Sequence, residues 1–556
     1  DSSKIVAIKG IGGFHIACST QNDEVVLRLR KNLKRPEQPF AIISKDKESV
    51  GEFAELSMEE EELLESWRRP IVILKKKKDF FLSKYLAPNL STIGVMLPYT
   101  PLHHLLFHYS KSKSFVMTSA NKPSYPMVVE NEAAFQELKF VDYYLIHNLK
   151  IVNRTDDSVI KFIKKKPVFV RRSRGYVPQY LEANHEKNVL ALGAELTNTF
   201  CITKNRKAIP SQYIGNTYNF DCLEFQKKAI SHFKRILKIK DFDYVFCDYH
   251  PEYNTTKLAL EFENVFKVQH HFAHGFSLGK DLVVIACDGM GYGVDSKIWG
   301  GEILYVGDEF ARLGHLENQV LAGGDVSTHY PARLSLAILK KVFKNPIEEM
   351  ERYEKYFRYG KEEMRIVLEQ IEKKVNVTET SSCGRILDSA SSILEICNFR
   401  SYEGEPAMKL EAIASGKEIE LPLEIFEVNE LKYITPYVEY KKKIKGKRGR
   451  LQILKTTPIV REIFERYRKG ERKKILAKSI LACIAKGLAQ IAIEGAREYE
   501  TKRIGFRGGC ALNSVMTEVI KREVEREGFE FLQQENVPPG DGGISYGQVK
   551  FAKFLG

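Results

Sequence analysis

The first third of the chain alternates short β-branched runs with segments of helical apolar spacing. Strand-like runs at residues 5–8 and 115–117 lie on either side of a segment, 25–33, in which apolar residues recur every three or four positions. This spacing is typical of a helix that buries one face, whereas short β-branched runs bounded by glycine or polar residues favour strands. The alternation predicts an α/β domain over residues 1–182.

The remainder of the chain repeats this alternation on a larger scale. After a polar linker at residues 181–187, buried-strand patterns at 188–195 and 283–287 run into small polar or glycine-rich turns. Residues from about 330 to 480 have mostly helical spacing. The pattern predicts a second α/β domain over residues 188–556, with a helical insertion at about 330–480.

The length and composition of the chain indicate how many domains it forms and in which cellular compartment it works. With 556 residues, the chain is long enough for more than one domain and an ample core. We find no apolar run of membrane-spanning length and no signal-peptide pattern, so no membrane association is expected. The nine cysteines form no C-x-x-C pair, which argues against a zinc ribbon or disulfide framework and favours the reducing cytoplasm. The start at Asp1, without a methionine, predicts a chain cut from a longer protein.

The charge balance bears on the partners. A net charge of +14 permits polyanionic partners, from ATP to RNA. The basic runs at 75–78 and 441–450 contain no interleaved aromatic residues that could stack on bases. We therefore interpret both runs as solvated surface and do not expect nucleic acid as a partner.

Candidate anion-binding residues in the first domain follow the ends of strands. Lys9 opens a glycine-rich turn after the first strand, where the backbone approaches a ligand closely and the lysine meets an anion. Ser119 and Asn121 lie in a small polar turn after the strand at 115–117, and Arg171 emerges from a later strand. These groups bind phosphate well, although ordinary capping turns have the same composition.

Two histidines are candidate metal ligands in the second domain. If residues 270–274 are helical, His270 and His274 stand one turn apart on the same face. Neutral imidazoles placed in this way share a divalent metal when a carboxylate arrives from elsewhere. The alternative is a pair of ordinary surface or core histidines, because the two-histidine spacing alone is not specific.

Glycine-rich turns elsewhere in the second domain indicate a nucleotide. Asp288 ends a buried strand and precedes alternating glycines, an arrangement that suits Mg²⁺ with phosphate close to the backbone, although Asp-Gly is also a common turn pair. Residues 504–513 have the pattern of a strand, a glycine turn and a helix start, where a nucleotide can lie against the helix N-terminus. With a further polar turn at 196–200, these features are typical of the two-lobed actin-like ATPase fold.

Four short sequence motifs in the first domain occur in the same order as in the YrdC-like domain of the HypF family, which this domain therefore resembles. The motifs are Lys-Gly-Ile-Gly-Gly-Phe-His at 9–15, Lys-Arg-Pro at 34–36, Thr-Ser-Ala-Asn at 118–121 and Arg-Arg-Ser-Arg-Gly-Tyr at 171–176. The resemblance implies an anion-binding pocket for ATP and a carbamoyl donor, lined by Lys9, Lys34, Arg35, Ser119, Asn121 and Arg171. The chain departs from the family at Gln38, where lysine is usual, and at residues 122–126.

Words in the second domain resemble the same family and the metal site of the TsaD-like carbamoyltransferases. They include Val-Gln-His-His at 268–271, Tyr-Glu-Gly-Glu-Pro-Ala-Met at 402–408 and Pro-Pro-Gly-Asp-Gly-Gly at 538–543. The resemblance implies a site for iron, zinc or magnesium made by His270, His274 and Asp541, and a nucleotide site made by Thr199, Asp288, Gly289, Gly291, Gly508, Gly509 and Asn513. One departure is Gly215-Asn216, where Gly-Asp is frequent.

The resemblance implies an ATP-dependent carbamoyltransferase of nickel–iron hydrogenase maturation. Such proteins form carbamoyl-adenylate from ATP, with Mg²⁺, and carbamate derived from carbamoyl phosphate. They pass the carbamoyl group to the C-terminal cysteine of the partner HypE. The family's acylphosphatase domain and paired C-x-x-C zinc motifs are not found in this sequence. Three alternatives stay open: an O-carbamoyltransferase for a small molecule, a tRNA threonylcarbamoylation enzyme, and a non-catalytic nucleotide- or RNA-binding module.

Overall fold

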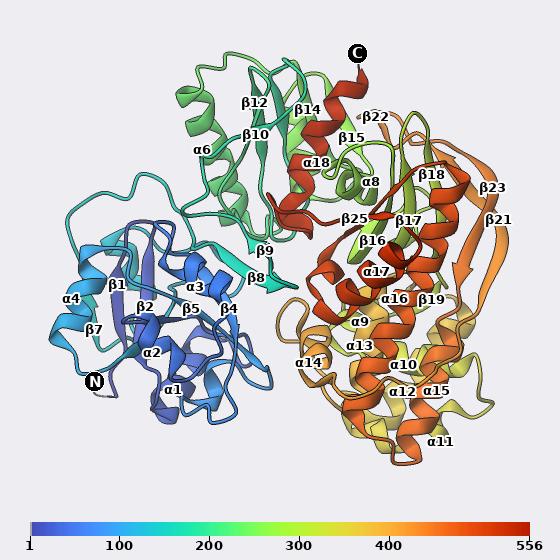
Figure 1. Ribbon diagram of the computed structural model, residues 1–556, viewed down its shortest axis with the longest axis horizontal. Helices are drawn as coiled ribbons and strands as arrows, with labels where there is room; N and C mark the ends of the chain where they lie inside the picture. Colours follow the sequence, from blue (N-terminus) through green and yellow to red (C-terminus); the bar gives the residue numbers. More distant parts are fainter. Residues whose placement is uncertain (1–2, 556) are drawn as a thin grey trace. The chain divides into compact units, whose positions relative to one another are not determined.

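The computed structural model describes residues 3–555 and divides them between two compact units (Figure 1). Unit 1 comprises Asp1–Cys247, Glu252–Asn264 and Glu535–Gly556, and unit 2 comprises Asp248–Pro251 and Val265–Gln534. Both units combine sheets with helices, so the predicted α/β class is confirmed. The predicted linker at 181–187 lies inside unit 1, and the predicted division into domains stays a prediction.

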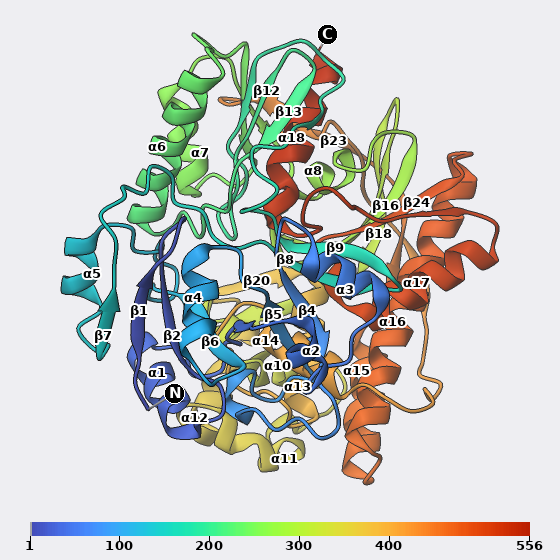
Figure 2. The same ribbon diagram turned by 60° about the vertical axis from the view of Figure 1, so that its left-hand side comes forward.

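A nine-stranded mixed sheet forms the first part of unit 1, in the order β7-β1-β2-β6-β3-β5-β4-β8-β9. Figure 2 shows β1, β2 and β6 side by side with α4 next to them, and Phe107 of α4 packs with Met117 of β6 in one apolar cluster. The strands are β1 (Val6–Lys9), β2 (Phe14–Ser19), β3 (Ile42–Ser44), β4 (Ile71–Lys75), β5 (Thr92–Met96), β6 (Ser114–Ser119), β7 (Tyr143–Leu145), β8 (Val159–Ile163) and β9 (Lys166–Arg171). The helices are α1 (Asp23–Leu33), α2 (Lys47–Gly51), α3 (Met58–Glu65), α4 (Pro101–Tyr109) and α5 (Asn131–Glu137).

The second part of unit 1 is a smaller sheet covered by helices. Its strands run in the order β10-β13-β12-β11-β14, with β11 parallel to β14. The C-terminal helix α18 returns to this sheet, because Gln548 accepts a hydrogen bond from the backbone of Gly193 at 3.0 Å. The elements are β10 (Leu181–Glu182), β11 (Val189–Ala191), β12 (Cys201–Lys204), β13 (Lys207–Pro210), β14 (Tyr244–Asp248), α6 (Phe220–Ile236), α7 (Asn254–Leu258) and α18 (Ile544–Phe551).

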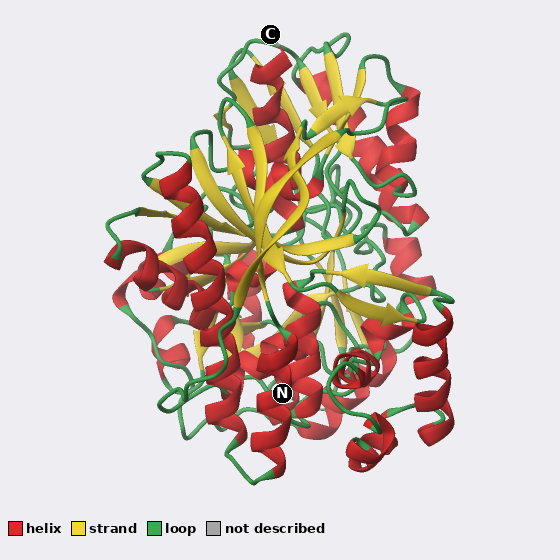
Figure 3. Ribbon diagram, turned by 90° about the vertical axis from the view of Figure 1, so that its right-hand side faces the viewer, coloured by secondary structure: helices red, strands yellow, loops and turns green. Residues whose placement is uncertain are grey.

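Unit 2 is built on a strongly twisted sheet, whose strands are yellow in Figure 3. The main path is β21-β23-β18-β17-β16-β24-β25, and β19 and β20 pair beside β17. Its strands are β16 (Leu282–Tyr292), β17 (Ile298–Val306), β18 (Phe310–Leu316), β19 (Gln319–Ala322), β20 (Val377–Thr380), β21 (Ile425–Ile434), β23 (Gly446–Leu454), β24 (Arg503–Arg507) and β25 (Glu530–Leu532). Two further strands of unit 2, β15 (Val265–Val268) and β22 (Tyr437–Glu439), form an antiparallel pair outside this path. The predicted helical insertion at about 330–480 therefore also contains strands.

The helices of unit 2 pack around α16, which fills the core of this unit. They are α8 (His270–Phe276), α9 (Val326–His329), α10 (Ala332–Lys340), α11 (Pro346–Glu349), α12 (Gly360–Lys373), α13 (Cys383–Ile393), α14 (Glu405–Ile413), α15 (Thr457–Arg468), α16 (Lys473–Glu498) and α17 (Ser514–Arg526). Gly487 and Gly495 let α16 approach the sheet closely, because an added Cβ would lie 2.5 Å from Leu454 and 2.4 Å from Leu313.

The length and apolarity of α16 also correct one sequence expectation. Among the described residues it is the one helix long and apolar enough to cross a membrane, and the sequence reading overlooked it. However, 78% of its most apolar window is buried inside the protein. A buried core helix passes the same test of length and composition as a spanning helix, so its apolarity is explained by packing.

Candidate metal and nucleotide sites

Helix α8 places the two predicted histidines on one buried face. The helix begins after Gln269, whose side chain accepts hydrogen bonds from the backbone of His271 and Phe272. It packs closely against the sheet at Gly275, where an added Cβ would lie 2.8 Å from Val306. The rings of His270 and His274 are 5.1 Å apart, so the predicted helical placement is confirmed.

A carboxylate from the neighbouring strand faces both histidines. Oδ2 of Asp288, in β16, lies 3.0 Å from Nε2 of His274 and 3.7 Å from Nε2 of His270. The three residues offer ligand atoms that all lie within 4.8 Å of one another. Two imidazoles and a carboxylate at this spacing fit a divalent metal.

A second carboxylate, which was not predicted from the sequence, orients His270 through the ring nitrogen that faces away from Asp288. Oδ2 of Asp248, at the end of β14, lies 2.7 Å from Nδ1 of His270, and both side chains are fully buried. A carboxylate at Nδ1 fixes the tautomer that presents Nε2 to the site. Asp248 opens the motif Asp-Tyr-His-Pro at 248–251, but its pairing with His270 depends on the fold.

Burial favours the neutral forms of His271 and His274, while hydrogen bonds favour the charged form of Asp288. Burial lowers the pKa of His274 to about 4 and that of His271 to about 3. Burial alone would raise the pKa of Asp288, but hydrogen bonds from His270 and His274 hold it well below its usual value. Neutral imidazole and ionised carboxylate are the forms that bind a metal.

Asp541, the third predicted metal ligand, belongs to the other compact unit. Asp541 begins the short helix η5 (Asp541–Gly543) in unit 1, next to the turn that contains Thr199. Oγ1 of Thr199 donates to the carbonyl oxygen of Gly542 at 3.0 Å and lies 2.8 Å from Oγ of Ser545. Because His270 and His274 lie in unit 2, the participation of Asp541 in their site stays a prediction.

The predicted nucleotide glycines gather where β24 meets β16. Parallel pairing of the two strands aligns Arg507 with Ala286 and brings Gly508 beside Cys287, the residue before Asp288 in β16. Gly508 has φ +88°, and an added Cβ would lie 2.0 Å from the carbonyl oxygen of Cys287. At Gly509 an added Cβ would lie 3.1 Å from Oδ1 of Asp288. The glycines therefore allow two backbone segments to meet beside a carboxylate.

The other predicted nucleotide residues have mixed surroundings. An added Cβ at Gly291 would lie 2.4 Å from the ring of His271, so this glycine accommodates α8. A Cβ added to Gly289 would lie 3.8 Å from Arg385 and 3.7 Å from Glu403, so this glycine faces both side chains. Asn513 is the N-cap of α17 and accepts from the backbone of Met516 at 3.1 Å, which is a structural role. Nucleotide binding by these residues stays a prediction.

Arg507 is a further candidate for binding an anion. It lies in the predicted glycine turn at 504–513 but was not predicted as a site residue. Its side chain is fully buried, and its three guanidinium nitrogens make no hydrogen bond within the described part of the chain. Burial lowers its pKa to about 9, and Asp288 opposes this shift. A buried cation next to the histidine cluster gives this site positive potential.

The first-domain candidates converge on a second site in unit 1. Arg35 donates to Oγ1 of Thr118 at 3.1 Å and to the side chain of Asn121 at 2.6 Å. Nη1 of Arg171 lies 3.7 Å from Oδ1 of Asp156, a residue that the sequence analysis did not assign. Burial lowers the pKa of Arg35 to about 10, and the positive charge of Arg171 adds to this effect. Two arginines that repel each other near one carboxylate therefore fit the predicted anion pocket.

Three other first-domain candidates are less closely grouped. Lys9 is buried and donates to the carbonyl oxygen of His147 at 3.2 Å. Lys34 is the exposed C-cap of α1, with φ +54°. Ser119 is the last residue of β6 and pairs with His15. Their binding roles stay predictions.

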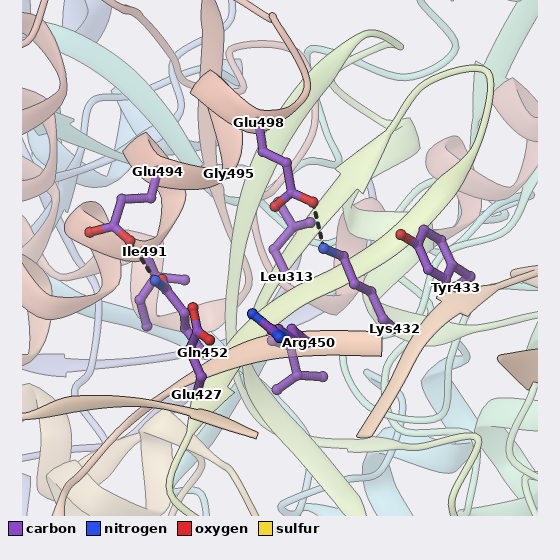
Figure 4. Close-up of a pocket in the computed structure, with 11 residues that line it drawn as sticks. Leu313, Glu427, Lys432, Tyr433, Arg450, Gln452, Ile491, Glu494, Gly495 and Glu498 are labelled. Carbon is purple, nitrogen blue, oxygen red and sulfur yellow. Dashed lines mark hydrogen bonds and ion pairs between the residues drawn. The ribbon is translucent and has the colours of Figure 1, made fainter. Parts of the chain in front are cut away.

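One surface cavity lies apart from these candidates. It has a volume of about 470 Å³ and lies in unit 2 between β21, β23 and α16 (Figure 4). Lys432 pairs with Glu498 at 2.5 Å, and Gln452 donates to Glu494. None of the predicted site residues lines this cavity, and its charges largely neutralise one another, so we assign no function to it.

Comparisons with known proteins cover the whole chain. The family described as "Telomere recombination" (Sua5/YciO/YrdC) matches residues 1–173. "HypF Kae1-like domain" matches residues 184–281, and "Carbamoyltransferase, Kae1-like Domain, second subdomain" matches residues 284–548.

Relatives and solved structures agree with these matches. The chain is 42% identical to the probable carbamoyltransferase HypF of Methanocaldococcus jannaschii, over 99% of this chain and 70% of the relative. It is 31% identical to carbamoyltransferase HypF of Rhizobium leguminosarum bv. viciae, over 100% of this chain and 71% of the relative. The crystal structure of T. kodakarensis HypF matches with a TM-score of 0.91 and 43% identity, over 100% of this chain and 72% of that chain. Full-length HypF in the phosphate- and nucleotide-bound form matches with a TM-score of 0.90 and 34% identity, over 100% of this chain and 85% of that chain. The chain therefore belongs to the HypF family of carbamoyltransferases.

Proposed function

We propose that this chain forms carbamoyl-adenylate from ATP and carbamate and transfers the carbamoyl group to the C-terminal cysteine of HypE. The observation that carries the proposal is the buried cluster of His270, His274 and Asp288 with Asp248 behind it. The arginine pocket of unit 1 supplies the second site that a two-step reaction needs. We place the reaction in the cytoplasm, where the nine free cysteines stay reduced.

The first step takes place in the arginine pocket. An oxygen of carbamate attacks the α-phosphorus of Mg²⁺-bound ATP, the bond to the β-phosphate breaks, and pyrophosphate leaves. Arg35 and Arg171 neutralise charge on the phosphates, and Asn121 holds Arg35 in place through its side-chain oxygen. Lys9 and Ser119 contribute at the ends of β1 and β6. Carbamate is supplied directly or by hydrolysis of carbamoyl phosphate.

The second step takes place at the histidine cluster. The thiolate sulfur of the acceptor cysteine attacks the carbamoyl carbon, the bond to the adenylate oxygen breaks, and AMP leaves. His270, His274 and Asp288 would hold a divalent metal, which would supply Lewis acidity for the transfer. Asp248 keeps His270 in the correct tautomer, and Arg507 stabilises negative charge on the leaving adenylate. Iron, zinc and magnesium are all compatible with this donor set.

One experiment measures the products of both steps. The chain is incubated with ATP, Mg²⁺, a divalent metal and either carbamate or carbamoyl phosphate, together with a peptide ending in cysteine. The proposal predicts AMP, pyrophosphate and a carbamoyl mass gain on the terminal cysteine, and no gain on a matched peptide ending in serine.

The acceptor separates the proposal from its alternatives. Modification of tRNA or of a small hydroxyl compound, with no modification of the cysteine peptide, would assign the chain to another carbamoyl transfer. ATP binding with no AMP under any acceptor condition would identify a non-catalytic module. The carbamate arm keeps the test valid if carbamoyl phosphate is not hydrolysed by this chain.

A further inference from the structure

A loop from the second sheet of unit 1 reaches the arginine pocket formed by the first sheet. The loop consists of residues 211–218 and follows β13. It belongs to the region matched by the HypF Kae1-like domain, whereas the pocket belongs to the region matched by the YrdC-type family. Both regions lie within one compact unit, so their contacts can be described together.

The second sheet fixes the conformation of this loop. The backbone of Ser211 donates to Phe200 at 2.8 Å, and the backbone of Ile214 donates to Asn198 at 2.9 Å. The backbone of Asn198 donates in return to Gly215 at 2.8 Å. Gly215 has φ +109°, which favours glycine. The position of Tyr213, between these anchors, is therefore set by the strands of the second sheet.

The ring of Tyr213 packs against the guanidinium group of Arg171. The central carbon of the guanidinium lies 4.4 Å from the ring centroid, within the range of a cation–π contact. On the other side, Nη1 of Arg171 lies 3.7 Å from Asp156. The arginine side chain is still 31% exposed, so the ring of Tyr213 and the carboxylate of Asp156 restrict a group that is otherwise partly free to move. Burial raises the pKa of the Tyr213 hydroxyl, and the charges of Arg171, Asp156 and Arg35 also act on it.

The same loop also contacts the turn that follows Asn121. The hydroxyl of Tyr218 donates to Oγ of Ser124, and Nδ2 of Asn216 donates to the same oxygen at 3.4 Å. Ser124 belongs to the turn that begins at Asn121, and Asn121 accepts the hydrogen bond of Arg35 at 2.6 Å. The loop thus contacts Arg171 directly and Arg35 indirectly, through the turn that carries Asn121.

We propose that Tyr213 is a positioning residue for adenylation, which holds the guanidinium of Arg171 toward the triphosphate of ATP. The inference rests on the function proposed above and deepens it, because the first-domain pocket is then complete only with a residue from the neighbouring region. A planar ring over a guanidinium restricts its rotation without competing for its N–H donors, which stay directed at an anion.

The test measures carbamate-dependent exchange of pyrophosphate into ATP, a readout of the first step alone. Tyr213→Ala and Tyr213→Leu are expected to raise KM for ATP about threefold to tenfold with kcat changed less than twofold, a magnitude typical of a partly buried cation–π contact. Tyr213→Phe keeps the ring and is expected to stay within twofold of the unaltered chain. Tyr180→Ala is a matched control, since this tyrosine also carries a cation, Lys207 at 4.3 Å, outside the pocket.

A double-mutant cycle with Arg171→Ala decides between positioning and general damage. If Tyr213 acts through Arg171, then Tyr213→Leu has no further effect on KM in the Arg171→Ala background. Fully additive effects would overturn the inference, and so would an unchanged KM in both Tyr213→Ala and Tyr213→Leu. Loss of kcat together with thermal stability in every variant, including Tyr213→Phe, would assign Tyr213 a purely structural role. Failure of the proposed function is distinguishable, because the unaltered chain would then show no carbamate-dependent exchange.

Discussion

Replacing Asp248 by asparagine tests whether the histidine cluster is an oriented metal site. Asp248 holds Nδ1 of His270 at 2.7 Å, and neither side chain is exposed to solvent. Asparagine has nearly the same size and removes the charge of the group that receives the imidazole proton. The change therefore leaves the packing of α8 intact and weakens the control over the tautomer of His270.

The structure sets the expected magnitude. A buried hydrogen bond to a charged group contributes roughly 1.5–3 kcal/mol, and a 1.4 kcal/mol change alters an equilibrium constant tenfold. The amide oxygen of asparagine can still accept from Nδ1 of His270, so the loss should lie toward the lower end. We expect metal affinity to fall about tenfold to hundredfold in Asp248→Asn, in line with other partners of metal-bound histidines.

The assay is competition for Zn²⁺ or Fe²⁺ against a chromophoric chelator at pH 7. His274→Ala removes a proposed ligand and should abolish tight binding. Asp46→Asn is the matched control, because Asp46 is the N-cap of α2 and asparagine is an equally good cap. The reasoning is refuted if Asp248→Asn binds metal within twofold of the unaltered chain while His274→Ala binds none. Equal binding by all variants would refute the site itself.

Three further predictions concern the core and the two sites. Glu302→Gln should destabilise unit 2 by about 3 kcal/mol at pH 7, because Arg312 at 2.6 Å holds the pKa of Glu302 at about 2 against the raising effect of burial. This contribution is complete above pH 4.5 and is lost as the pH falls toward 2, so the gap in urea midpoint should shrink over that range; an equal gap at pH 7 and pH 3 would contradict the assignment. Gly508→Ala should yield little folded protein, measured as soluble yield and thermal midpoint, since an added Cβ lies 2.0 Å from the backbone of Cys287 and φ is +88°; near-native stability would show that the strands can separate. Arg35→Lys should reduce carbamate-dependent pyrophosphate exchange more than tenfold despite retaining the charge, because lysine lacks the planar fork; exchange within twofold would refute a geometric role for this arginine.

The sequence determined the local features of this protein. The spacing of His270 and His274 predicts their common face, and the structure confirms it because an α-helix brings residues four apart together whatever surrounds it. The glycine turn at 508–509 is likewise visible in sequence, because few other residues tolerate its backbone. The family resemblance was also visible in the sequence, in the order of its short motifs. Relatives that match almost the whole chain confirm it.

Some local features remained hidden because their sequence signal was ambiguous. The strands β21 and β23 alternate apolar and polar residues, but they are rich in charged side chains and lie between helices, so the region reads as helical. Helix α16 has the apolarity of a membrane helix, and only its burial in unit 2 identifies it as a core element. In both cases the surrounding packing decides which pattern the chain follows.

The tertiary structure alone decided which distant groups meet. Asp288 was predicted from its glycines as a nucleotide residue, and the pairing of α8 with β16 places its carboxylate against both histidines. Asp248 reaches His270 across 22 positions, and Tyr213 reaches Arg171 from a separate sheet. Such contacts depend on strand order and on helix packing against the sheet, which no local spacing encodes. The sequence therefore determines the candidate groups, and long-range packing determines their partners and the charge state in which burial holds them.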